Sequence, residues 1–154
     1  MQHYEEKLKK YILVNNLEAE QLLFNQSCHS VQEAATAAGV TPEDFVKNIC
    51  MVTDEGNLIV AIVKGEDRVS TSRVGKALQI ARPRIATESE ILTKTGFPCG
   101  GVPSFGYQAT FIIDPKVMEK EIVYTGGGSP NSLVRIATAE LLRTTNGLLF
   151  RIRK

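Results

Sequence analysis

Apolar and charged positions alternate at helical spacing at the start of the chain. Over residues 4–15, the apolar and aromatic positions are Tyr4, Leu8, Tyr11 and Ile12, and most positions between them carry Glu or Lys. This spacing matches the 3.6-residue period of an α-helix with one apolar face. Residues 1–18 are therefore predicted to contain an amphipathic N-terminal helix.

Further helices are indicated by residues that cap helix ends. The capping-box pattern, in which side chain and backbone bond reciprocally, occurs twice, at Ser30 with Glu33 and at Thr87 with Glu90. The helices that begin there are predicted to end at Gly39 and Gly96, because glycine readily adopts the left-handed conformation that closes a helix. Thr41 followed by Pro42 predicts a short helix, and two more helices are predicted at residues 72–78 and from residue 138.

Short runs of β-branched and apolar residues predict the strands. These runs are residues 21–24, 49–53, 58–63, 109–113, 121–124, 133–137 and 148–152. Residues 54–57 join the second run to the third and contain Gly56, which predicts a β-hairpin. Hairpins interspersed with short helices favour a mixed α/β (α+β) sheet over a regular βαβ alternation.

The length and composition are those of one globular domain. The chain has 154 residues, of which 43% are hydrophobic and 23% charged, and its formal charge is +1. We therefore expect a single domain over residues 1–154. The longest aliphatic run, residues 58–63, is far shorter than the roughly 20 residues of a membrane-spanning helix. The acidic N-terminus differs from a signal peptide, so we expect a cytoplasmic protein that contacts no membrane.

Cysteine and histidine are too few and too scattered for several kinds of chemistry. The three cysteines, Cys28, Cys50 and Cys99, are widely separated, and only His3 and His29 supply imidazoles. This content argues against a disulfide framework and a zinc site. A Ser-His mechanism at His29 is disfavoured because Ser30 is better used as a helix cap. No metal and no cofactor are predicted.

The near-neutral total charge conceals an asymmetry along the chain. Residues 1–63 carry a net charge of −5 and residues 64–154 a net charge of +6. A clustered positive face would suit a polyanion. The same net charges would also result if the basic residues were dispersed over a solvated surface, so net charge by itself identifies no partner.

Three features are candidates for a functional site. Lys47 is predicted at the end of a capped helix, just before a strand, where it could hold a phosphate or simply complement the helix dipole. Residues 96–106 form a Gly- and Pro-rich loop whose N–H groups could stabilise an oxyanion. Residues 125–130, which include Gly126 and Gly127, could cradle a phosphate or sugar. Either loop could also be purely structural, and neither has the pattern of a P-loop or dinucleotide-binding turn.

Taken in order along the chain, these segments resemble the YbaK-type aminoacyl-tRNA deacylases. The matching stretches are His29-Ser30-Val31-Gln32-Glu33-Ala34-Ala35, Val46-Lys47-Asn48, residues 95–106 and Gly126-Gly127-Gly128-Ser129-Pro130-Asn131. This family includes free-standing relatives of the prolyl-tRNA synthetase editing domain. The resemblance implies a compact fold around a mixed, curved β-sheet and metal-free hydrolysis of the ester that joins a wrong amino acid to the terminal adenosine of tRNA.

The resemblance also implies roles for individual residues. Lys47 would anchor a phosphate or the terminal adenosine, and the backbone from Gly100 and Gly101 to Ser104 would hold the ester carbonyl, with a ribose hydroxyl of the substrate assisting the attacking water. The remaining residues expected to contact the substrate are His29, Val46, Asn48, Val102, Pro103, Thr125, Gly126 and Gly127. Many relatives have a G-x-x-x-P stretch in this loop, whereas here Ser104 stands at the last position and Pro103 precedes it.

The implied partners are the acceptor end of an aminoacyl-tRNA and, as a further possibility, an aminoacyl-tRNA synthetase; no DNA is expected. Small residues such as alanine or cysteine are the usual targets of the family. Two other hypotheses remain open at this point. The chain could be a non-catalytic tRNA- or synthetase-binding module of the same fold, or an esterase for small molecules whose activity would not depend on salt.

Overall fold

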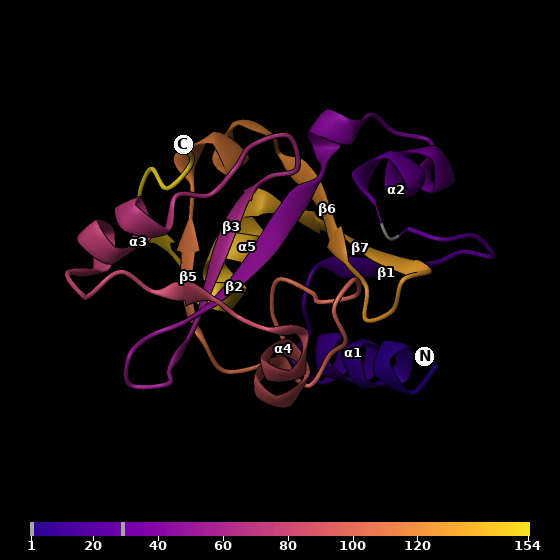
Figure 1. Ribbon diagram of the computed structural model, residues 1–154. Helices are drawn as coiled ribbons and strands as arrows, with labels where there is room; N and C mark the ends of the chain where they lie inside the picture. The colour runs from indigo at the N-terminus through magenta and orange to yellow at the C-terminus, as the bar shows by residue number, and fades with distance from the viewer. Residues whose placement is uncertain (1, 29) are drawn as a thin grey trace.

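The strands of this computed structural model, which describes residues 2–28 and 30–154, form two sheets (Figure 1). The antiparallel sheet has the order β1 (Ala19–Leu23), β7 (Ser132–Ala137) and β6 (Ile122–Gly126). The mixed sheet has the order β4 (Arg84–Ile85), β2 (Val46–Val52), β3 (Leu58–Lys64), β5 (Thr110–Ile113) and β8 (Leu148–Leu149). The predicted hairpin is β2 with β3, and β3 pairs with β5 in parallel.

Helices surround the sheets. The α-helices of the described residues are α1 (Gln2–Val14), α2 (Val31–Ala38), α3 (Thr71–Leu78), α4 (Glu88–Thr95) and α5 (Thr138–Thr145), and two 3-10 helices span Pro42–Asp44 and Pro115–Glu119. Both predicted caps lie at helix starts: Glu33 N donates to Ser30 Oγ over 3.0 Å and Glu90 N to Thr87 Oγ1 over 3.2 Å. At Thr87 the capping box is completed by the backbone N–H of Thr87, which donates to Glu90 Oε1 over 3.0 Å, whereas at Ser30 the Glu33 carboxylate accepts from the Ser30 hydroxyl over 3.2 Å. Gly39 and Gly96 end these helices in the left-handed conformation.

The main core lies on the face that the two sheets share. It contains alternate residues of β2 and β3, such as Cys50 and Val60, together with Val134 from β7 and Leu8 from α1. A second cluster covers the opposite face of the mixed sheet, where Val74 of α3 packs with Met51 and Ile152. Side chains of successive strand residues point to opposite faces, so the central strands β2, β3 and β5 are covered on both sides, whereas the short edge strands β4 and β8 are exposed.

The mixed α/β fold predicted from the sequence is confirmed, and several boundaries differ. Lys47 does not end a helix: the helix stops at Asp44, and Lys47 is the second residue of β2. The predicted strand at residues 148–152 is only Leu148–Leu149. The short strand β4 was missed because two exposed residues carry no periodic signal. Within the described part of the chain, no helix is both long and apolar enough to span a membrane.

Candidate active site at the edge of strand β2

A cavity of about 250 Å³ lies beside the N-terminal half of β2. In the described residues, β4 pairs with β2 only at Met51 and Val52, so the edge of β2 before these residues has no strand partner within its own sheet. The antiparallel sheet approaches there, through a bridge between Phe45 and Tyr124. The cavity is thus formed where the two sheets meet.

The cavity brings together most of the residues expected from the sequence. Val46, Lys47, Asn48, Gly100, Val102, Thr125 and Gly126 all line it. Gly101, Pro103, Ser104 and Gly127 are buried and are not among its lining residues. His29 lies outside the described residues. Segments that are far apart in the sequence therefore form one wall.

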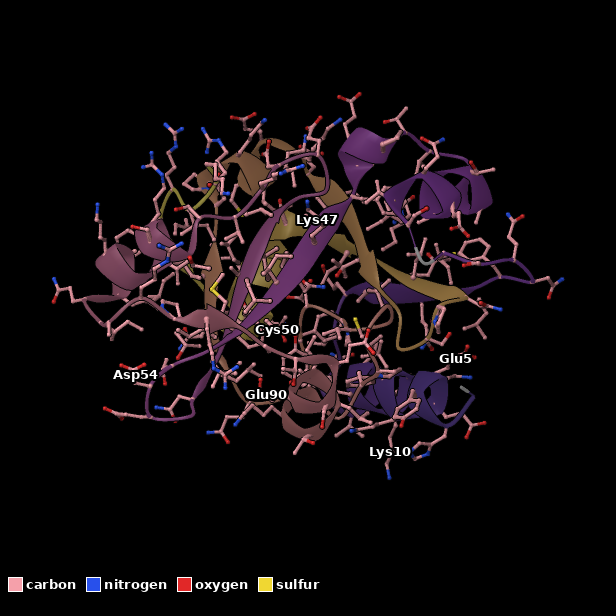
Figure 2. The ribbon with its side chains drawn as sticks, in the orientation of Figure 1. Glu5, Lys10, Lys47, Cys50, Asp54 and Glu90 are labelled. Atoms are coloured by element: carbon pink, nitrogen blue, oxygen red, sulfur yellow. The ribbon has the colours of Figure 1, made fainter. Side chains whose placement is uncertain are left out.

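Lys47 is half-buried and pairs with Val63 of β3, and Figure 2 labels it near the upper end of β2. Burial and the neighbouring Arg68 guanidinium lower the pKa of Lys47, and Asp67 partly opposes this effect. Asp67 is itself bound to Lys116 Nζ at 3.3 Å. Within the described residues, the Lys47 ammonium makes no hydrogen bond or ion pair, so its charge is available to an anion in the cavity.

Asn48 points to the opposite side of the strand and joins a closed ring of hydrogen bonds. Its Nδ2 donates to Thr125 Oγ1 over 2.9 Å, and Ser104 Oγ donates to Asn48 Oδ1 over 2.5 Å. The Ser104 and Thr125 hydroxyls are 2.6 Å apart. Because the Ser104 proton is already used, Thr125 is the donor in this third bond. We call this arrangement the Asn48–Ser104–Thr125 ring.

The ring fixes the backbone of the Gly- and Pro-rich loop. The second Nδ2 proton of Asn48 is donated to the carbonyl oxygen of Val102 over 3.0 Å. Ser104 is fully buried and Thr125 is nearly so. The loop is therefore anchored to both sheets at once, through Ser104, Asn48 of β2 and Thr125 of β6.

The glycines of the two loops permit the loops to pack backbone against backbone. A Cβ at Gly126 would lie 2.1 Å from Val102 O, and a Cβ at Gly101 would lie 2.6 Å from Ser129 N. Gly101 N donates to Pro98 O, and its carbonyl oxygen accepts from Gly128 N. Gly100 adopts a φ of 93°, which favours glycine.

Two backbone N–H groups at the cavity wall have no acceptor among the residues that the structure describes. Those of Gly100 and Val102 make no hydrogen bond to any of residues 2–28 and 30–154, whereas that of Gly101 is committed to Pro98. Backbone N–H groups held in place by a rigid loop are suitable donors to a carbonyl or an oxyanion.

Helix α1 supports the two loops from the side opposite the cavity. Ser129 Oγ donates to a carboxylate oxygen of Glu5 over 2.5 Å, and Lys7 Nζ donates to Gly96 O over 3.2 Å. Gln21 Nε2 bridges the carbonyl oxygens of Glu5 and Gly127. Figure 2 shows Glu5 on this helix beside the loops. The sequence pattern predicted α1 but gave no sign of these contacts.

Sequence reasoning also missed the apolar half of the cavity. Cys28, Val31, Ala34, Phe45, Ile91 and Leu133 line it. The helical spacing of the apolar residues in α2, such as Val31 and Ala34, is typical of any buried helix face, so it gave no signal for a pocket. An apolar wall of this kind accepts a small uncharged side chain by burying its surface.

The described residues contain no group of three or more His, Cys, Asp or Glu side chains that could hold a metal ion. Burial and the neighbouring Cys99 raise the pKa of Cys50 to about 12, and burial followed by the charge of Glu33 raises the pKa of Cys28. Nucleophilic thiols have lowered pKa values, so these two thiols are unsuited to that role.

The profile of the aminoacyl-tRNA editing domain family matches residues 25–144, which is most of the chain. The protein therefore belongs to this family, whose YbaK-type members are related to the prolyl-tRNA synthetase editing domain. The resemblance inferred from the motifs is confirmed.

Relatives of known sequence or structure agree with this assignment. The uncharacterized protein YwhH of Bacillus subtilis is 26% identical over 82% of this chain and 81% of its own length. Proline--tRNA ligase of Thermotoga neapolitana is 23% identical over 66% of this chain, which spans only 19% of the ligase. The crystal structure of a proposed trans-editing enzyme for prolyl tRNA synthetase superposes with a TM-score of 0.90 at 23% identity and covers 98% of this chain and 97% of that one. At this identity the structural match establishes the fold.

Proposed function

We propose that this protein is a trans-acting aminoacyl-tRNA deacylase, which hydrolyses the ester that joins a wrong amino acid to the terminal adenosine of tRNA. The observation that carries the proposal is the cavity at the edge of β2. It combines the Lys47 cation and the N–H groups of Gly100 and Val102, none of which has a partner among residues 2–28 and 30–154, with an apolar wall.

The chemistry follows from where these groups lie. Water attacks the ester carbonyl carbon, and the oxyanion that forms accepts hydrogen bonds from the N–H groups of Gly100 and Val102. The ester C–O bond then breaks, the ribose oxygen takes up a proton, and free amino acid and deacylated tRNA result. A ribose hydroxyl of the substrate is proposed to orient the water, in place of a side-chain base.

Lys47 has an electrostatic role in this proposal. Its half-buried ammonium would bind a phosphate or the terminal adenosine and so place the ester against the loop. The Arg68 guanidinium, which lowers the pKa of Lys47, makes the same region attractive to an anion. Positioning of this kind can lower a reaction barrier by several kcal/mol.

The amino acid removed is proposed to be small, such as alanine or cysteine. Phe45, Val31 and Leu133 crowd the apolar wall, within a cavity of about 250 Å³ that must also admit part of the ribose. A pocket that discriminates by size excludes larger side chains well, while one methylene is worth only about 1–3 kcal/mol.

Release of amino acid from a panel of charged tRNAs, including Ala-tRNAPro and Cys-tRNAPro, tests the proposal. Wild type is compared with Lys47→Ala and with Lys10→Ala, a matched control whose lysine is exposed on α1, far from Lys47 in Figure 2. Hydrolysis of one species by wild type and Lys10→Ala, but not by Lys47→Ala, is the expected result.

Two other outcomes would replace the proposal. Binding of tRNA without release from any charged species would favour a non-catalytic module of the same fold. Hydrolysis of simple esters at a rate that is independent of tRNA and of salt would favour a small-molecule esterase, because binding to tRNA phosphates weakens as salt rises.

A further inference from the structure

Two segments of the chain contain basic residues but no Asp or Glu. Residues 68–87 carry Arg68, Arg73, Lys76, Arg82 and Arg84, and residues 141–154 carry Arg143, Arg151, Arg153 and Lys154. Together they hold half of the 18 Lys and Arg residues of the chain. The positive charge of the second half of the sequence is therefore concentrated in two short stretches.

The fold places these two segments side by side. Val69 and Arg153 form an antiparallel bridge, and Lys154 N donates to Arg68 O over 2.8 Å. Ser70 N donates to Ile152 O over 2.7 Å immediately before α3 begins. Figure 1 shows the C-terminal end of the chain near α3. Cations that are some 80 positions apart in the sequence thus lie on neighbouring backbone.

Six of the nine cations have no acidic partner in the part of the chain that the structure describes. Arg84, Arg143 and Arg153 pair with Glu90, Glu140 and Asp114, respectively. The others are exposed and make no ion pair with any residue that the structure describes; we call them the basic surface, and they are Arg68, Arg73, Lys76, Arg82, Arg151 and Lys154. Their mutual repulsion is relieved when an anion binds.

The basic surface extends over α3 and reaches the cavity. Arg73 and Lys76 are three residues apart and exposed on α3, and Arg82 Nε donates to Thr71 Oγ1 on the same helix over 2.7 Å. At the other end, Arg68 is close enough to Lys47 to repel its charge. An eight-residue helix is about 12 Å long, so cations spread along it suit several phosphates better than one.

We propose that the basic surface binds the phosphate backbone of the RNA duplex that adjoins the single-stranded end in the cavity. This inference rests on the proposed function, which places that end next to Lys47. Arg and Lys side chains on a helix surface contact phosphates without reading bases. The surface would therefore accept acceptor stems of different sequence and leave selection of the amino acid to the cavity.

The test measures binding of deacylated tRNA and of an RNA hairpin by fluorescence anisotropy between 50 and 200 mM salt. The variant is Arg73→Gln/Lys76→Gln, which removes both charges but keeps polar side chains that favour a helix at these exposed positions, and the matched control is Lys9→Gln/Lys10→Gln on α1. Each phosphate contact contributes about −0.9 to the slope of log K against log salt. A variant that has lost two contacts should therefore lose about tenfold less affinity than wild type when the salt concentration rises fourfold.

Weaker RNA binding with this smaller salt slope in the α3 variant, and not in the α1 control, would support the inference. In deacylation assays, the α3 variant should then raise KM with kcat unchanged. Wild-type affinity and slope in the α3 variant would overturn it. The inference would also be overturned if polyglutamate displaced the labelled RNA as well as unlabelled RNA does at the same concentration of charges, because the surface would then bind any polyanion.

These measurements separate this inference from the proposed function. Binding of deacylated tRNA needs no hydrolysis, so RNA binding that depends on Arg73 and Lys76 can stand even if no charged tRNA is hydrolysed. Conversely, Lys47-dependent hydrolysis with an unchanged KM in the α3 variant would overturn the inference and leave the deacylase in place.

Discussion

Replacing Ser104 with alanine removes one hydroxyl from the Asn48–Ser104–Thr125 ring. The change leaves Asn48 Oδ1 without its donor and the Thr125 hydroxyl without its acceptor. An unsatisfied buried polar group costs about 1–3 kcal/mol. Thr125 is buried, whereas half-buried Asn48 lines the cavity, where a solvent donor can replace the lost hydroxyl, so we expect a total loss of about 2 kcal/mol. For a chain of this length, that loss lowers Tm by roughly 4–8 °C.

The same change releases the loop that the ring holds. Asn48 anchors the carbonyl of Val102, whose N–H is one of the two proposed oxyanion donors. A displacement of about 1 Å at a reacting centre can reduce the rate roughly a hundredfold. Ser104→Ala is therefore expected to reduce kcat for aminoacyl-tRNA by at least about tenfold, measured at a temperature where the variant is fully folded.

A control separates stability from geometry. Thr138 Oγ1 donates to Lys120 O over 2.8 Å, and neither residue lines the cavity. Thr138→Val removes this hydroxyl without changing side-chain volume much, so it should lower Tm but leave kcat unchanged. Thermal unfolding followed by circular dichroism and single-turnover deacylation give both numbers for each variant.

A double-mutant cycle tests the ring directly. Ser104→Ala and Asn48→Ala together should cost less than the sum of the single changes, because each alone already breaks the bond they share. Strict additivity, or a Ser104→Ala variant with wild-type Tm and kcat, would refute the claim that the ring holds the loop.

Three further predictions concern other parts of the molecule. Gly126→Ala should lower both stability and activity, because its Cβ would meet Val102 O at 2.1 Å and force the loops apart; Tm and kcat measure this. Cys99→Ser should retain deacylation, and a folded but inactive variant would revive a thiol mechanism. Burial disfavours ionised Asp114, but hydrogen bonds from the N–H groups of Lys116, Ile152 and Arg153 and from the Arg153 side chain outweigh burial and lower its pKa. This stabilisation is present above the unfolded pKa of about 3.9 and is lost as pH falls through the lower folded value, so Tm should decrease less steeply on acidification in Asp114→Asn than in wild type.

Features that depend on neighbouring residues could be predicted from the amino-acid sequence. Ser30 and Thr87 cap helices because the N–H groups they accept lie three positions away, and the hairpin of β2 and β3 closes through a connection of only a few residues. The ordered glycine motifs similarly identified the family, since they occur at recognisable spacings. Lys47 was found as a candidate, although its place in a strand was not.

How distant segments combine depends on packing across the whole fold. The bonds of the ring join residues separated by 56, 77 and 21 positions, and no local pattern indicates which polar side chains will meet across two sheets. The basic surface likewise depends on the C-terminal segment pairing with residues 68–70. Such contacts depend on the packing of the whole core, which places side chains by burying apolar surface that is spread along the entire chain. The residues of the site were therefore largely visible in the sequence, while their geometry was not.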